Sequence, residues 1–265
     1  MRLWSQNVSR ERWTPLAREG GQRVVADETP VAIVHDASTT AVLMASPNDI
    51  EDLAVGFSMT EGLIDSPDQI QAMEVVDGDL GLEARLWLTS DRSHRLAARR
   101  RQIVGPTGCG LCGVDSLAQA APPPPVIRHT LTVSPIDLLS AMNDLSASQV
   151  LGRETRAAHA AGFWTPDRGL RALREDVGRH NALDKLAGAL ARSSISGPGV
   201  VLLTSRVSVE MVQKTAAMGA PILCAVSAPT GLAIRTAQAA GLTLVAIARH
   251  DGFEIFTGAH RIVAR

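Results

Sequence analysis

Two cysteines in a glycine-rich segment are the residues most suited to chemistry. Cys109 and Cys112 lie within Gly105-Pro106-Thr107-Gly108-Cys109-Gly110-Leu111-Cys112-Gly113. Glycines leave a sulfur atom with little steric cover and bring backbone N–H groups close to an anionic thiolate. Five arginines between positions 92 and 101 precede this run, and positive charge favours thiolate over thiol. The pattern is typical of a reactive cysteine that a partner thiol or a substrate must reach.

Such a cysteine pair is compatible with zinc binding, thiol–disulfide redox chemistry or sulfur relay. A structural zinc site needs about four protein ligands, and the third cysteine, Cys224, stands in an apolar run typical of a buried strand. A zinc nucleobase deaminase needs His-x-Glu upstream and proline directly before its first cysteine. Here Gly108 precedes Cys109, and neither His35 nor His94 begins that pattern. The cysteine pair alone does not decide among these chemistries. With the rest of the chain taken into account, we favour sulfur relay and expect no metal, with zinc and redox as alternatives.

Polar residues also follow three successive apolar runs in the last third of the chain, at positions 204–206, 227–231 and 249–252. In an open parallel sheet, ligands bind outside the carboxyl ends of the strands. The first two groups run into helix starts, whose free N–H groups attract phosphate. We therefore name Ser205, Arg206 and Thr230 as candidate ligands of a nucleotide diphosphate. Ordinary helix capping by Ser or Thr remains an alternative for each group.

Residues 175–185 form another dense polar run that leads into a predicted helix. His180 and Asp176 could serve there as acid/base or orienting groups. A histidine at a helix start is more often a capping or core hydrogen-bonding residue, so both interpretations stay open. His159, between two alanines, is a weaker candidate of the same kind.

The composition is that of an ordinary globular protein, with 45% hydrophobic residues, 20% charged residues and a net charge of −1 over 265 residues. A chain so close to neutral is not expected to bind nucleic acid or a membrane surface. Its apolar runs are far shorter than the ~20 residues that cross a bilayer. The N-terminus lacks the apolar core of a secretory signal, and three cysteines are too few for a disulfide framework. We therefore expect a cytoplasmic protein.

The elements that must position these residues fall into separate parts. Residues 1–20 are expected to form a polar tail, residues 21–121 an N-terminal subdomain with the cysteine segment, and residues 126–265 an α/β cofactor-binding subdomain. In the N-terminal subdomain the sequence predicts strands at 31–34 and 41–44. It also predicts a helix capped by Ser46 with Pro47 at its first position. A hairpin over 73–88 is expected around Asp77-Gly78, with a loop that could extend to Gly81.

In the α/β part, Ser134 is predicted to cap a helix. Beyond it, predicted strands over 200–204, 221–226 and 242–248 alternate with predicted helices over 207–218 and 231–240. Strands that alternate with helices of that length indicate βαβ units, and hence a parallel sheet covered by helices.

Several long motifs, in one order, make residues 28–258 resemble the formate dehydrogenase accessory sulfurtransferase family (FdhD/NarQ). The motifs are Thr29-Pro30-Val31, Asp49-Ile50-Glu51-Asp52-Leu53-Ala54-Val55-Gly56-Phe57, Gly108-Cys109-Gly110-Leu111-Cys112-Gly113, the run at 175–185, Ser205-Arg206-Val207-Ser208, Glu210-Met211-Val212-Gln213-Lys214 and Ser227-Ala228-Pro229-Thr230. The resemblance implies a cytidine-deaminase-like α/β fold. In that fold a parallel or mixed sheet is covered by helices, with a smaller N-terminal β-rich subdomain. It also implies a homodimer.

The resemblance further implies a sulfurtransferase with a cysteine persulfide intermediate. A cysteine desulfurase would load the persulfide. The sulfur would then pass to the molybdenum bis(molybdopterin guanine dinucleotide) cofactor, bound as a substrate, before this cofactor enters the catalytic subunit of formate dehydrogenase. A non-catalytic chaperone that binds the molybdenum cofactor is the alternative.

The resemblance also implies the site residues. It places the persulfide on Cys109, with Cys112 as the second thiol. The cofactor-binding segment falls on Ile247, Ala248, Arg249, His250, Asp251 and Gly252.

Overall fold

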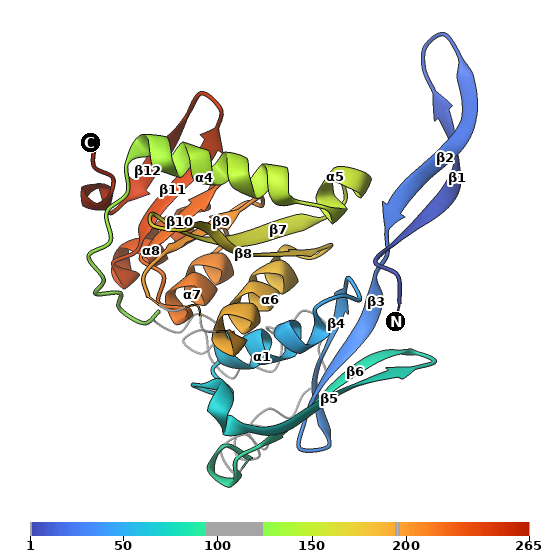
Figure 1. Cartoon of the computed structure of the whole chain (residues 1–265), viewed down its shortest axis with the longest axis horizontal. Helices are drawn as coiled ribbons and strands as arrows, with labels where there is room; N and C mark the ends of the chain where they lie inside the picture. The colour runs from blue at the N-terminus through green and yellow to red at the C-terminus, as the bar shows by residue number, and fades with distance from the viewer. Residues whose placement is uncertain (1, 94–123, 194, 196, 265) are drawn as a thin grey trace.

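The computed structural model describes residues 2–93, 124–193, 195 and 197–264, and its strands form three sheets (Figure 1). The largest has six strands: β7 (His159–Thr165), β8 (Gly169–Asp176), β9 (Val200–Leu203), β10 (Ile222–Ala225), β11 (Thr243–Arg249) and β12 (Gly252–Thr257). They follow the order β12-β11-β10-β9-β7-β8. The central strands β9, β10 and β11 run parallel, whereas β7, β8 and β12 pair antiparallel. The sheet is therefore mixed.

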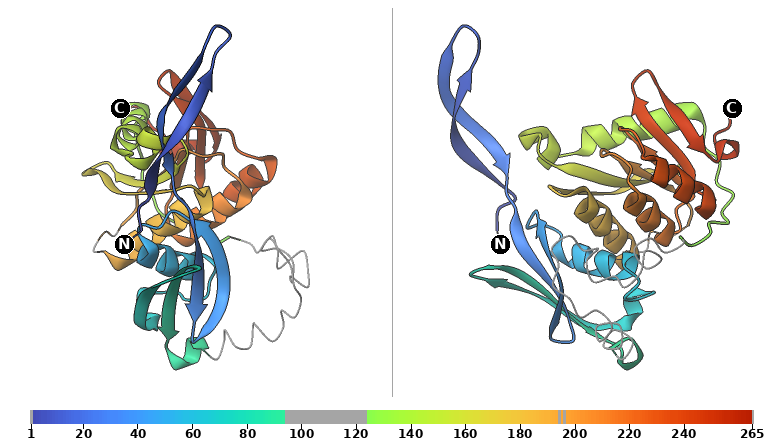
Figure 2. Two further views of the ribbon diagram at one scale, coloured as in Figure 1. Left: turned by 90° about the vertical axis from the view of Figure 1, so that its right-hand side faces the viewer. Right: turned by 180° about the vertical axis from the view of Figure 1, so that it is seen from behind.

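Helices cover both faces of this sheet (Figures 1 and 2). They are α4 (Pro135–Ser148), α5 (Leu151–Thr155), α6 (Arg179–Arg192), α7 (Val209–Ala217) and α8 (Gly231–Ala240), with a 3-10 turn η2 (Ala259–Arg261) near the end. Apolar residues of α6, α7 and α8 share one core cluster with the sheet, and those of α4 share another on the opposite face. Because β9 and β10 are covered on both faces, they are buried at every position.

A smaller sheet precedes this layer in the chain. It consists of β3 (Thr29–His35), β4 (Ser38–Ala45), β5 (Ile70–Gly78) and β6 (Gly81–Leu88) in the order β4-β3-β6-β5, with a 3-10 turn η1 (Pro67–Gln69) before β5. Helix α1 (Ile50–Thr60) packs its apolar residues, Leu53 among them, against this sheet. The predicted fold class is confirmed: a mixed sheet covered by helices, with a smaller β-rich part at the N-terminus.

The expected polar tail over residues 1–20 is wrong, because these residues belong to a hairpin. Strand β1 (Ser5–Trp13) pairs antiparallel with β2 (Arg18–Ala26). The hairpin projects away from the rest of the molecule (Figure 2). Its turn is closed by Thr14, whose N–H donates to the carbonyl of Ala17 over 2.8 Å. Since cross-strand hydrogen bonds rather than a buried face hold this hairpin, its polar composition gave no strand signal.

Two local predictions in the N-terminal part also need correction. Helix α1 begins at Ile50, and its N-cap is Asp49 rather than Ser46, because the Ser46 backbone bonds to a distant carboxylate instead. The predicted hairpin over 73–88 is confirmed, but it turns at Asp79 and Leu80, after Gly78 has paired with Gly81.

Helices α1 and α6 touch at a pair of glycines. A Cβ atom added to Gly56 of α1 would lie 1.7 Å from the carbonyl oxygen of Asp184, and one added to Gly188 of α6 would lie 1.9 Å from that of Asp52. Non-bonded atoms do not approach so closely, so any larger residue would push the two backbones apart. This contact joins the helix of the small sheet to a helix of the large one.

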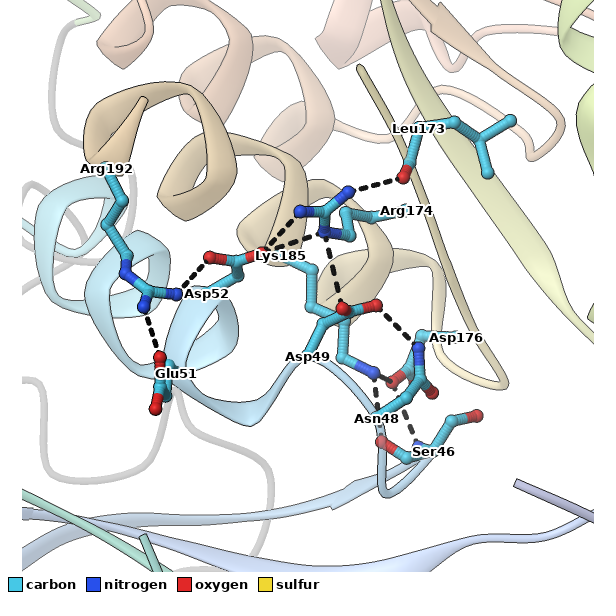
Figure 3. Close-up of polar contacts among 10 residues, drawn as sticks. All are labelled: Ser46, Asn48, Asp49, Glu51, Asp52, Leu173, Arg174, Asp176, Lys185 and Arg192. Atoms are coloured by element: carbon cyan, nitrogen blue, oxygen red, sulfur yellow. Dashed lines mark hydrogen bonds and ion pairs between the residues drawn. The ribbon is translucent and has the colours of Figure 1, made fainter. Parts of the chain in front are cut away.

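A buried ion pair lies beside this crossing (Figure 3). Lys185 is fully buried, with its Nζ 2.7 Å from Oδ2 of Asp176, and it donates to the carbonyl of Ser46 over 2.9 Å. Asp176 in turn accepts from the N–H of Ser46 at 3.0 Å. Burial lowers the pKa of Lys185, and the carboxylate of Asp176 opposes that shift. The pair fixes the segment before α1 against the end of β8.

The second lysine is buried at the same junction. Nζ of Lys214 on α7 lies 2.9 Å from Asp184 and 2.8 Å from Glu61. Thr60 also donates to Asp184 over 2.6 Å. Burial disfavours the charge of Lys214, but the carboxylates of Asp184 and Glu61 outweigh it and raise its pKa. The chain's two lysines thus both serve the contact between its two parts.

Arginines complete the junction on the α1 side (Figure 3). Asp52, 5% exposed, lies 2.7 Å from Nη2 of Arg174 and 2.5 Å from Nη1 of Arg192. Glu51 also pairs with Arg192. The acidic first turn of α1 is therefore held by cations from β8 and α6.

Replacing Gly56 by alanine tests the glycine contact. We expect Gly56→Ala to lower the free energy of unfolding by about 3 kcal/mol, at the upper end of overpacking costs, because the clash is with backbone. Urea unfolding measures the change. The matched control is Gly20→Ala on β2, where nothing lies within 4 Å of the added Cβ, and a change below about 0.5 kcal/mol is expected. Equal effects of the two substitutions would contradict the tight crossing.

Candidate functional site

The carboxyl ends of β9, β10 and β11 meet at one edge of the large sheet, and the loops that follow them are bonded to one another. The N–H of Val207 donates to the carbonyl of Ala228 at 3.2 Å, and the N–H of Thr230 donates to the carbonyl of Val207 at 3.0 Å. The N–H of Ile247 donates to the carbonyl of Ser227 at 3.3 Å. The structure therefore brings together the three polar groups that the sequence predicted to converge. We call this region the carboxyl edge.

The candidate phosphate ligands on the first two loops differ in their availability. Ser205 is 3% exposed, and its hydroxyl donates to the carbonyl of Arg206 over 3.0 Å. Thr230 is exposed and caps α8 by accepting from the N–H of Ala233 at 3.2 Å, which leaves its hydroxyl hydrogen free to donate. Arg206 is exposed and forms no ion pair within the described parts of the chain. Arg206 and Thr230 are thus presented to solvent, whereas Ser205 shapes its own loop.

The segment at 247–252 forms the turn between β11 and β12. Arg249 pairs with Gly252 across the ladder, so His250 and Asp251 form the turn, and these two side chains and that of Arg249 are exposed. Ile247 has a φ of 55°, a left-handed conformation that a β-branched residue rarely adopts. The pairing register with β12 shifts across Ile247, between Ala246 and Arg249. Local strain of this kind is often found at ligand sites.

Two histidines reach the same edge from other elements. Because β7 runs antiparallel to β9, and β8 antiparallel to β7, the start of β7 and the end of β8 lie at the carboxyl edge. His159 opens β7, and His180 lies in the first turn of α6, which follows β8. Helices α6, α7 and α8 all begin here, so three positive helix ends face one region. Sequence patterns did not predict this grouping, because antiparallel strands do not follow the βαβ alternation.

Burial and nearby positive charge favour the neutral form of both histidines. Burial lowers the pKa of His159, and the charges of Arg179 and Arg206 lower it further. Burial and then Arg179 lower the pKa of His180, whose Nε2 lies 4.0 Å from a carboxylate oxygen of Glu210. The Nε atom of Arg179 is buried without a hydrogen-bond partner among the described residues. Arginines therefore carry the positive charge of this edge, an arrangement suited to anions.

Asp176, considered above as a possible acid/base group, lies at this edge but is fully buried in its pair with Lys185. Its carboxylate already accepts from the N–H groups of Ser46 and Gly178. The polar run that contains Asp176 therefore positions the start of α6 through buried contacts.

Of the three cysteines, the structure describes Cys224. Cys109 and Cys112 lie outside the described residues. Cys224 is fully buried in β10, as predicted, and burial raises the pKa of its thiol far above the usual range, so it is inert at neutral pH. In the described ranges, no three His, Cys, Asp or Glu side chains form a group that could hold a metal ion. None of the helices in those ranges is long and apolar enough to cross a membrane.

Comparisons with known proteins agree over nearly the whole chain. The model of the FdhD/NarQ family matches residues 26–263. A protein of Agrobacterium fabrum named "Sulfur carrier protein FdhD" is 53% identical over 252 residues, covering 93% of each chain. A protein of the same name from Brucella abortus is 46% identical, covering 98% of this chain and 99% of its own. The crystal structure of a "putative formate dehydrogenase accessory protein" from Desulfotalea psychrophila superposes with a TM-score of 0.76 at 26% identity, covering 98% of this chain and 100% of that one.

Proposed function

Because the chain belongs to the FdhD/NarQ family, we propose that it carries sulfur for the maturation of a formate dehydrogenase. The observation that carries this proposal is the match to proteins named as sulfur carriers, which extends over more than nine-tenths of the chain at 46–53% identity. The proposal adds a mechanism, a substrate and partners to that match.

The proposed carrier atom is the sulfur of Cys109, in the glycine-rich segment that the sequence singled out. Its thiolate attacks the terminal sulfur of a persulfide on a cysteine desulfurase. An S–S bond forms on Cys109, and the desulfurase leaves as a thiolate. The protein is then a sulfurtransferase with a cysteine persulfide intermediate.

Cys112 supplies an intramolecular step that releases the sulfur from Cys109. Its thiolate attacks the inner sulfur of the Cys109 persulfide, so a Cys109–Cys112 disulfide forms and hydrosulfide leaves. The sulfur that leaves as hydrosulfide takes up the electron pair that the two cysteines give up when their disulfide forms. The disulfide must be reduced before the next turnover, which suits the reducing cytoplasm where we place the protein.

The proposed substrate is the molybdenum bis(molybdopterin guanine dinucleotide) cofactor, held at the carboxyl edge by its phosphates. Arg206, Thr230 and Arg249 are exposed there on three different loops. Neither arginine forms an ion pair within the described residues. Guanidinium groups and helix N-termini are suited to phosphate oxygens. The donor set therefore fits an anionic dinucleotide.

Two partners follow from this mechanism, the cysteine desulfurase and the catalytic subunit of formate dehydrogenase. The family resemblance adds a second copy of the chain. The alternative is a cofactor-binding chaperone in which the cysteines do not turn over. The two functions differ in whether Cys109 holds sulfur covalently.

Replacing Cys109 by alanine separates these functions. We expect Cys109→Ala to abolish formate dehydrogenase activity in cells that depend on the variant, because the attacking thiolate is gone. After incubation with a desulfurase and cysteine, mass spectrometry should show one added sulfur on the wild type and on Cys112→Ala, and none at this position in Cys109→Ala. Cys224→Ala is the control for loss of a thiol elsewhere, and it should keep its activity. Full enzyme activity with Cys109→Ala would favour the chaperone.

Replacing Arg249 by alanine tests the carboxyl edge with GDP as a fragment of the cofactor. We expect Arg249→Ala to weaken GDP binding by about 1.5–3 kcal/mol, the usual contribution of a charge-assisted hydrogen bond. Binding should also weaken with added salt. Titration calorimetry measures both effects, and Arg128→Ala, an exposed arginine before α4, is the control. Equal GDP affinity of the wild type and Arg249→Ala would place the nucleotide elsewhere.

A further inference from the structure

A second cationic region lies on the other side of His159, between the end of α4, α5 and the start of β7. It is a shallow hollow of about 560 Å³, which we call the arginine hollow. Its walls include Arg153 from α5, Arg156 directly after that helix, His159 from β7, and the residues Gln149 and Thr204. Within the described part of the chain, no carboxylate lines it. None of the residues assigned above to the cofactor lines it either.

The two arginines of this hollow are free to bind an anion. Both are exposed, and neither forms an ion pair or a side-chain hydrogen bond within the parts of the chain that the structure describes. The nearby carboxylate of Glu175 is 3% exposed and already accepts from the N–H groups of Leu151 and Gly152 at 2.9 and 2.8 Å. The charge of Glu175 is therefore engaged inside the protein and does not compete for the arginines.

The short helix that carries these arginines is held at both ends. Glu175 accepts from the backbone at its start, including the N–H of Val150 at 2.8 Å. Arg23 of the N-terminal hairpin donates to the carbonyl of Thr155 at its end over 3.2 Å. Arg156 follows with a φ of 58° as the C-cap. Because the backbone is fixed, little ordering of α5 is needed when a ligand arrives.

We propose that the arginine hollow binds a phosphate group through the guanidinium groups of Arg153 and Arg156. The phosphate belongs either to a free inorganic anion or to a nucleotide. This site does not depend on the proposed sulfur-carrier function, because it rests on the charge and shape of the hollow alone. Two guanidinium groups without carboxylate partners offer bidentate bonds to phosphate oxygens.

His159 reports occupancy of the hollow. The charged groups around it are Arg179 of α6, Arg206 after β9 and Asp176 of β8, with Arg153 and Arg156 in the same hollow. In the free protein burial lowers the pKa of His159, and the charges of Arg179 and Arg206 lower it further. A phosphate anion beside the ring stabilises the imidazolium, so the pKa of His159 rises when the hollow is filled.

The test uses the full chain, with inorganic phosphate, pyrophosphate and GDP as probes. The double variant Arg153→Gln/Arg156→Gln should bind pyrophosphate at least about tenfold more weakly than the wild type, since two charge-assisted bonds are lost. The control, Arg12→Gln/Arg128→Gln, removes the same charge from two exposed arginines elsewhere and should stay within about twofold of the wild type. Proton NMR of the His159 ring, assigned with His159→Gln, should show a higher pKa in phosphate than in chloride.

The probes distinguish the source of the phosphate. If the double variant weakens pyrophosphate but not GDP, the hollow takes a free anion; if it weakens both, the hollow takes a nucleotide phosphate. The proposal is overturned if the double variant binds pyrophosphate as the wild type does, or if phosphate leaves the pKa of His159 unchanged. It is also overturned if Arg249→Ala weakens the binding of both pyrophosphate and GDP while the double variant weakens neither, because the phosphate then lies at the carboxyl edge.

Discussion

The contact between Gly56 of α1 and Gly188 of α6 is the constraint on which the rest of this structure depends. Two helix backbones touch there without side chains between them. The contact places the acidic start of α1 against cations from the larger layer, and it brings both lysines of the chain into buried positions next to carboxylates. Buried ion pairs contribute little net stability, but each is costly to break by removing one partner. The junction therefore holds one arrangement of the two sheets.

The same junction positions the carboxyl edge. Asp176 ends β8, pairs with Lys185 in the second turn of α6, and bonds to Ser46, which directly follows strand β4 of the small sheet. The start of α6, with Arg179 and His180, is thereby fixed next to the loops after β9 and β10. The long motifs at 49–57 and 175–185, which carry the family resemblance, thus include residues whose role is to hold the two parts together. The exposed Arg206 and Arg249 at the carboxyl edge take no part in this junction and remain available to bind ligands.

The sequence predicted best what local pattern determines. The bounds of α8 match the structure, and Ser134 caps α4 as expected, because both depend on a hydroxyl residue followed by apolar spacing. The alternation around Cys224 indicated the parallel strands. Sequence reasoning failed where a residue's hydrogen-bond partner lies far away in the chain. Ser46 was expected to cap α1, but it bonds to Asp176, 130 positions away. The histidines of the site were likewise found singly, since only the antiparallel strands bring them to one edge.

Native-state hydrogen exchange tests most directly whether the helix contact unites the two parts. Amides in the middle of α1, around Leu53, and in the middle of α6, around Leu186, are measured at increasing urea concentrations. Because the two helices can separate only by breaking the glycine contact and the buried ion pairs, their amides should exchange with one common free energy of opening and one common urea dependence. Exchange of α1 at a clearly lower opening free energy than α6 would show that the small sheet opens independently, and would contradict the account.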